Sequence, residues 1–309
     1  MWLLDAKTIQ LREFADNEIP RYAILSHTWG SITEEVTFAD MLEAAERASA
    51  GDEKPHIETA KKTGFFKIES SCRQALADEI DYVWVDTCCI NKNSLTDLSE
   101  AINSMFRWYQ GARVCYAFLA DVPPKTPSEK WLRHLYAARW FQRGWTLQEL
   151  LAPPDVRFYS KDWTFIGTRS KMRHTIARIT GIDVAYLDGK DLRHASVAKK
   201  MSWASQRTTT RLEDTAYCLL GIFNVNMPLL YGEGNKAFLR LQEEIIKDSE
   251  DQSIFAWGSR QPWSGALRLR GLFARSPAEF AESGDIVPSP GLLSSNPYAL
   301  TNRGLRIEL

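Results

Sequence analysis

The stretch RWFQRGWTLQELLAPP, residues 139–154, determines how the rest of the chain is interpreted. It gathers aromatic side chains, two arginines and one carboxylate ahead of a Pro-Pro stop, and the β-like run Val156–Tyr159 follows. Pro153 has no N–H to donate and biases Ala152 away from helical angles, so a short helix should end here and lead into a strand. Glu149 then lies in the last turn, where the helix macrodipole disfavours an acid. We therefore expect Glu149 to be kept for a reason other than helix stability.

A surface ion pair with Arg143 or Arg139 is the simpler explanation for this carboxylate, and such a pair contributes little to stability. The neighbouring aromatic residues Trp140, Phe141 and Trp145 favour a different account, because such side chains are rarely gathered on a purely solvated face. A carboxylate between apolar walls is a common feature of functional sites.

Composition excludes several classes of protein. With 309 residues and 44% hydrophobic content, the chain can bury the core of one large domain or two small ones. Lys and Arg number 38 against 39 Asp and Glu, so no basic field favours nucleic acid or an anionic membrane. Asp5 interrupts the apolar N-terminus, and no run is long enough to cross a bilayer, so we expect neither a signal peptide nor a membrane span.

The cysteines indicate a reducing compartment. Their number is odd and no CxxC spacing occurs, which favours reduced thiols in a cytoplasmic protein and predicts no metal site. The five are Cys72, Cys88, Cys89, Cys115 and Cys218.

Apolar runs alternate with helical patterns through the first half of the chain. The predicted buried strands are residues 22–28, 82–86, 114–119 and 156–159, and the predicted helices between them are residues 59–78, 94–111 and a segment that Ser128 caps. In the helix at 94–111, Ser94 should be the N-cap, and Gly111 occupies the place of a left-handed C-terminal cap. This alternation predicts the α/β class, with a mostly parallel sheet wrapped by helices.

The second half has a different pattern. We expect residues 1–165 to form the α/β core and residues 166–252 to form a helical portion packed on it, with helices at 170–180, 196–205, 213–223 and 235–247. Residues 253–309 should be a β-rich C-terminal segment that leads into a longer chain, with strand-like runs at 254–257, 298–301 and 305–309.

Polar residues follow the first two predicted strands. Ser26, His27 and Trp29 come at the end of the first strand, and Asp86 ends the second. Because ligands of open α/β sheets bind at the carboxyl ends of strands, these side chains are predicted to line a pocket together with Glu149. For His27 alone, an ordinary hydrogen-bonded histidine is the competing explanation.

Three separated blocks resemble the signatures of the fungal HET (heterokaryon incompatibility) domain. They read RYAILSHTWG at 21–30, DYVWVDTCCINKNSLTDLSEAINSMFRWY at 81–109 and RGWTLQELLAPPDVRFYSKDW at 143–163, and the resemblance extends over about residues 22–257. It implies a fungal effector of nonself recognition, a form of innate immunity, that triggers programmed cell death in vegetative incompatibility. It also implies self-association on activation, and partners among other incompatibility or NLR-type proteins.

The HET sheet is in turn similar to the TIR fold, which is flavodoxin-like. Trp145 and Glu149 resemble the tryptophan and catalytic glutamate of NAD-cleaving TIR proteins, although three residues separate them here where TIR enzymes usually have two. The resemblance makes Glu149 the candidate catalytic carboxylate and NAD+ the substrate, with no bound cofactor. A carboxylate facing the ribose stabilises an oxocarbenium-like transition state. The implied substrate-binding residues are Arg143 for a phosphate, Trp145 or Trp29 for a ring, and Ser26, His27 and Asp86 as pocket lining.

Two other functions remain open from the sequence. Cys88 or Cys89, with His27 and Asp86, supplies the residue types of a cysteine hydrolase, although adjacent cysteines after a buried strand are also common as small core residues. A non-enzymatic death-signalling adaptor needs no particular chemistry, and exposed members of the eleven tryptophans would then form its assembly surface.

Overall fold

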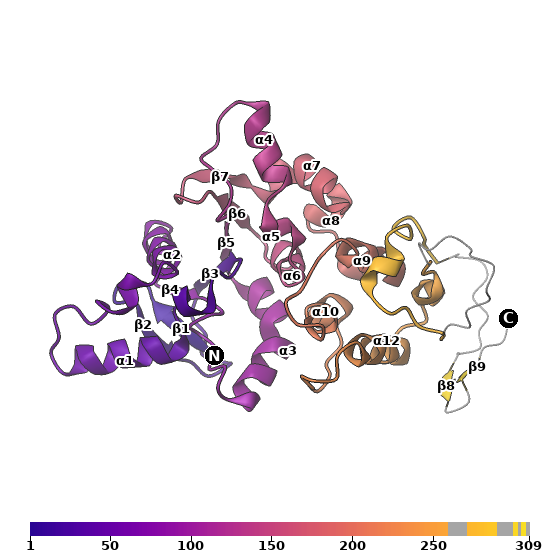
Figure 1. The fold of residues 1–309 in the computed structure, drawn as a ribbon, viewed down its shortest axis with the longest axis horizontal. Coiled ribbons are helices and arrows are strands. Elements are labelled where there is room, and N and C mark those ends of the chain that lie inside the picture. Colours follow the sequence, from indigo (N-terminus) through magenta and orange to yellow (C-terminus); the bar gives the residue numbers. More distant parts are fainter. Residues whose placement is uncertain (259–270, 289–298, 302–303, 307–309) are drawn as a thin grey trace. The chain divides into compact units, whose positions relative to one another are not determined.

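The computed structural model describes residues 1–258, 271–288, 299–301 and 304–306, which divide into two compact units (Figure 1). The first unit comprises Met1–Trp140 and Glu149–Met172, and the second comprises Phe141–Gln148 and Arg173–Leu309. The boundary between them therefore falls within the stretch from which the sequence was interpreted.

The first unit is built on a seven-stranded sheet with the order β2-β1-β4-β3-β5-β6-β7. Its four central strands, β4, β3, β5 and β6, are parallel, and antiparallel strands flank them on both edges. The predicted α/β class with a mostly parallel core is confirmed. The strands are β1 (Trp2–Asp5), β2 (Gln10–Glu13), β3 (Tyr22–His27), β4 (Tyr82–Trp84), β5 (Val114–Phe118), β6 (Val156–Tyr159) and β7 (Phe165–Thr168).

All four predicted strands are present, because their sequences suit burial on both faces of a sheet. Every residue of β3 and of β5 is buried, as expected for central parallel strands. The three strands that the sequence analysis missed, β1, β2 and β7, have four residues each and lie in the antiparallel margins. Such short segments carry little periodicity, and their pairing is set by the neighbouring strands.

Helices cover the sheet of the first unit, and α2 packs against β3 and β4. Ser94 caps α3 as predicted, because its hydroxyl accepts from the Asp97 N–H. The predicted left-handed cap at Gly111 is wrong: Gly111 is the last residue of the helix, and the chain leaves in extended conformation at Ala112. The helices are α1 (Phe38–Ser49), α2 (Phe65–Ala77), α3 (Leu95–Gly111), α4 (Glu129–Tyr136) and α5 (Arg139–Gln142), with 3-10 turns η1 (Ile32–Glu34) and η2 (Thr59–Lys61).

The stretch at residues 139–154 forms two short helices, α5 and α6 (Thr146–Leu151), where a single helix was predicted. Gly144 lies between them and packs so closely that an added Cβ would come 2.6 Å from Thr209 Cγ2 and 3.0 Å from Cys218 Sγ. Only glycine fits without rearrangement here. As predicted, the Pro-Pro pair ends the helix and β6 follows.

The second unit is mainly helical, as expected from the sequence. Gly181 adopts a left-handed conformation directly after α7. Residues 213–223 form two short helices in place of the single one predicted. The elements are α7 (Arg169–Thr180), which begins in the first unit, α8 (Val184–Leu187), η3 (Leu192–His194), α9 (Val197–Ala204), α10 (Asp214–Tyr217), α11 (Leu220–Phe223) and α12 (Lys236–Asp248).

The C-terminal segment differs in part from its prediction. The predicted strand at 254–257 is wrong, because part of that run lies in the 3-10 helix η4 (Gln252–Phe255). A further 3-10 helix, η5 (Pro277–Phe280), follows. A hairpin of β8 (Ala299–Thr301) and β9 (Gly304–Arg306) accounts for part of the last two runs, while residues 298 and 307–309 lie outside the described residues. None of the described helices combines the length and apolarity that a membrane span needs.

Candidate active site

Glu149 is buried in the first unit, where it belongs to a hydrogen-bonded group with Ser26 and Trp140. The Ser26 hydroxyl, near the end of β3, donates to Glu149 Oε2, and Trp140 Nε1 donates to Ser26 Oγ over 2.8 Å. Glu149 is 5% exposed, and the other two side chains are fully buried. The surface ion pair considered for this carboxylate is therefore wrong. A buried carboxylate needs hydrogen bonds, and Ser26 supplies one at the end of a central strand.

Arg169 resolves the conflict between Glu149 and the helix dipole. Its Nη1 donates to the carbonyl oxygens of Leu150 at 2.7 Å and Pro153 at 2.9 Å, and its Nη2 donates to Pro154 at 3.2 Å. Arg169 is only 6% exposed. A cation that binds the last carbonyls of a helix compensates the negative end of the macrodipole. The fold thus supports an acid where local helix physics alone would not.

A second group forms around Asp86, which follows β4. His27 Nε2 lies 2.9 Å from Asp86 Oδ1, and Trp29 Nε1 donates to Asp86 Oδ2 at 2.8 Å. Burial alone would raise the pKa of Asp86, but the charge of Lys92 and the hydrogen bonds from His27 and Trp29 lower it well below its usual range. Asp86 is therefore held as an anion.

The two groups share β3 but are separate. Ser26 and His27 are consecutive in the strand, so their side chains point to opposite faces of the sheet. Tyr109 lies within electrostatic reach of both groups: burial raises the pKa of its phenol, and the charges of Glu149 and Asp86 raise it further. Its hydroxyl donates to the backbone oxygen of Leu25, also in β3, over 3.2 Å. Of the predicted residues, Ser26 and Glu149 thus form one group and His27, Trp29 and Asp86 form another.

Cys88 and Cys89 lie beside Asp86 in sequence, but their contacts do not suit a cysteine nucleophile. Both are buried, and their sulfurs face backbone groups: Cys88 Sγ is 3.9 Å from Val85 O, and Cys89 Sγ is 3.3 Å from Val85 N. Burial raises the pKa of the Cys89 thiol well above its usual range. Among the described hydrogen bonds, that of the His27 side chain goes to Asp86 and not to either cysteine sulfur.

Arg143 and Trp145 belong to the second unit, where each has a partner. Arg143 Nη2 donates to Thr210 Oγ1 over 2.9 Å. Trp145 gives a hydrogen bond to Asp214. Burial raises the pKa of Asp214 above its usual value, and the hydrogen bonds from Tyr231 and Trp145 offset only part of this increase. Their predicted roles toward a substrate stay predictions.

A buried ion pair supports the turn after Trp29. Lys67 Nζ lies 2.6 Å from Glu35 Oε1, and the same oxygen accepts the Gly30 N–H at 2.6 Å. The two charged side chains are only 7% and 6% exposed. Because Gly30 directly follows Trp29, the pair fixes the backbone that presents the indole.

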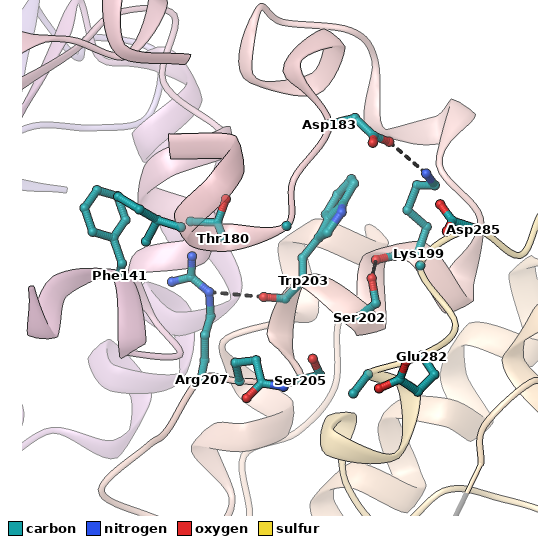
Figure 2. A pocket seen from close by; sticks show the side chains of 15 residues that line it. Phe141, Thr180, Asp183, Lys199, Ser202, Trp203, Ser205, Arg207, Glu282 and Asp285 are labelled. Atoms are coloured by element: carbon teal, nitrogen blue, oxygen red, sulfur yellow. Dashed lines mark hydrogen bonds and ion pairs between the residues drawn. The ribbon is translucent and has the colours of Figure 1, made fainter. Parts of the chain in front are cut away.

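The second unit has a separate cavity of about 370 Å³. Figure 2 shows Asp183 and Lys199, paired at 2.7 Å, on one side, and Arg207 beside Trp203 on another. Arg207 Nη1 also donates to the backbone oxygen of Arg143 at 2.8 Å. None of the predicted site residues lines this cavity.

The sequence analysis missed Arg169, Lys92 and Tyr109. Lys92 and Tyr109 fall inside the second HET-like block, which was the only available signal for them. Arg169 lies outside all three blocks. Among the described residues, no group of three or more His, Cys, Asp or Glu side chains is arranged to hold a metal ion.

Comparison with known proteins identifies the family. Residues 22–127 match the family described as "Heterokaryon incompatibility protein (HET)", and residues 236–269 match "Domain of unknown function (DUF8212)". Our chain belongs to the HET family, as the three sequence blocks predicted. It is 45% identical over 244 residues to the vegetative incompatibility protein HET-E-1 of Podospora anserina. That match covers 77% of this chain and 17% of the relative, so the chain spans a small part of that protein's length. No solved structure matches.

Proposed function

We propose that this chain is a cytoplasmic effector of heterokaryon incompatibility that triggers cell death by cleaving NAD+ to nicotinamide and ADP-ribose. The relative's name supports the incompatibility part. The burial of Glu149 against Ser26 at the carboxyl end of β3 is the observation that carries the chemical part. Ligands of open α/β sheets bind at such strand ends.

Cleavage of the bond between nicotinamide and ribose needs few protein groups. The ribose develops oxocarbenium character as the bond breaks, and one carboxylate stabilises this positive charge. Nicotinamide leaves as a neutral base, so no strong general acid is required. In this scheme Glu149 faces the ribose, and Ser26 and Trp140 fix its carboxylate in one orientation. Water then completes the hydrolysis to ADP-ribose.

Access to the carboxylate is the step that activation must provide. Glu149 is 5% exposed, so a substrate reaches it only after the surrounding residues move. Self-association on activation, together with other incompatibility or NLR-type proteins, would provide that change. A resting monomer is then expected to be inactive.

The test is expression in a host cell, with NAD+ and nicotinamide followed over time. Wild type is compared with Glu149→Gln, which keeps the shape and an oxygen for Ser26, and with Glu53→Gln at an exposed position as the matched control. Loss of NAD+ that Glu149→Gln abolishes and Glu53→Gln preserves is the expected result.

Two other outcomes would reject this chemistry. If cells die while NAD+ stays intact, and the Glu149→Gln variant still kills them, the non-enzymatic adaptor is favoured. Cell death that Cys88→Ala abolishes while Glu149→Gln retains it would favour the cysteine hydrolase.

A further inference from the structure

Trp29 is an exposed tryptophan that the protein holds in a fixed orientation. Trp29 is 47% exposed, although it lies only two residues after His27, the buried last residue of β3. The indole N–H donates to Asp86 Oδ2 at 2.8 Å, and Lys92 Nζ lies 3.8 Å from the ring centroid. An exposed aromatic ring without a function would not need a hydrogen bond and a cation to fix its orientation. One edge and one face of the ring thus have fixed partners, and about half of the residue remains exposed to a ligand.

Asp86 is itself immobilised behind the indole. His27 Nε2 binds its other oxygen at 2.9 Å, and the His27 side chain is almost fully buried. His27 Nδ1 is buried and has no hydrogen-bond partner within the described residues. This part of the structure therefore contains an unsatisfied polar atom as well as a rigid support, a combination more typical of binding sites than of stable cores.

Lys92 supplies a charge that the chain does not neutralise by direct contact. Its ammonium has no ion pair or hydrogen bond within the described residues, and its nearest described contact is the Trp29 ring. Burial lowers the pKa of this half-buried lysine, and Asp86 offsets part of that effect. Three N–H donors next to an aromatic platform are suited to an anionic group such as a phosphate.

We propose that Trp29, Lys92 and Asp86 form a nucleotide-binding site at the carboxyl end of β3 and β4. The base stacks on the open face of the Trp29 indole, a phosphate accepts hydrogen bonds from Lys92 Nζ, and Asp86 and His27 hold the platform. The inference rests on the proposed function only in taking NAD+ as the nucleotide. Binding itself requires no cleavage.

Binding of AMP and ADP-ribose to the purified chain tests the site. The protein carries Glu149→Ala, so that cleavage plays no part, and adenosine and ribose 5-phosphate serve as half-ligands. Both nucleotides should bind, and each half-ligand should bind more weakly. Trp29→Ala should weaken AMP binding about tenfold or more, whereas Trp29→Phe retains most of it. Lys92→Met should reduce the affinity for AMP to that for adenosine.

Phe165→Ala is the matched control, because Phe165 is a similarly exposed aromatic residue, at 49%, on the edge strand β7. Its AMP affinity should equal that of the parent, and unfolding curves should show that every variant is folded. The site is overturned if AMP and ADP-ribose fail to bind at millimolar concentration. Equal loss in Phe165→Ala, or unchanged affinity in both Trp29→Ala and Lys92→Met, overturns it as well.

This experiment fails independently of the proposed function. If nucleotide binding depends on Trp29 and Lys92 but the chain never consumes NAD+ in cells, the binding site is supported and the proposed cleavage is rejected. If NAD+ consumption depends on Glu149 but is unchanged by Trp29→Ala, the proposed cleavage is supported and the binding site is rejected.

Discussion

Replacing Lys67 by methionine should strongly destabilise the first unit. The substitution nearly preserves the volume but leaves Glu35, whose side chain is 6% exposed, as a buried charge without its cation. Breaking one partner of a buried ion pair costs about 3 to 5 kcal/mol, far more than a surface pair is worth. Urea unfolding followed by circular dichroism, with linear extrapolation to water, measures this loss.

The double variant Glu35→Gln with Lys67→Met provides the control. Glutamine removes the stranded charge but keeps an oxygen for the Gly30 N–H, which Glu35 Oε1 accepts at 2.6 Å. We therefore expect the double variant to recover most of the lost free energy, since replacing a whole buried pair by neutral groups is often nearly neutral. A loss below about 1 kcal/mol in Lys67→Met would refute the reasoning. A double variant no more stable than the single one would refute it too.

Three further expectations follow from buried groups. Arg169→Met should cost at least about 3 kcal/mol in urea unfolding, because it leaves carbonyls at and just beyond the end of α6 without a donor, and an equally stable variant would disprove the capping role. The pKa of Asp86 is lowered in the folded state, so its charge stabilises the fold above the pKa of the unfolded chain. The difference in free energy of unfolding between wild type and Asp86→Asn should therefore be full above about pH 5 and decrease below about pH 4. A difference independent of pH would contradict this. All five free thiols are buried, so a thiol reagent at mildly alkaline pH should label none in the native chain and five in denaturant; rapid native labelling of Cys88 would revive the cysteine nucleophile.

Much of the first unit could be predicted from sequence, because its central strands are mostly apolar and largely buried. β3 and β5 are buried along their whole length, and continuous apolar runs of that kind have few alternatives. The marginal strands β1, β2 and β7 could not be predicted, since their pairing depends on partners distant in the chain. The left-handed cap predicted at Gly111 was wrong because glycine permits that conformation but does not require it.

The candidate site was predicted in its composition but not in its arrangement. Ser26, His27 and Asp86 were placed near strand ends and lie there, whereas Glu149 was placed in a short helix, and its carboxylate accepts a hydrogen bond from Ser26. Their division into two groups follows from strand alternation at β3 together with the position of the helix that carries Glu149. No local pattern encodes that position.

The sequence by itself determined the α/β class, the family and the candidate site residues, because hydrophobic periodicity and motif order are properties of the chain alone. Only the tertiary structure decided what those residues contact. Arg169 reaches the end of α6, Lys92 lies over the indole of Trp29, and Ser26 bridges Trp140 and Glu149 across more than a hundred residues of sequence. Such contacts arise when distant segments pack together, and burial then gives each charge and hydrogen bond a strength that no local sequence pattern reveals.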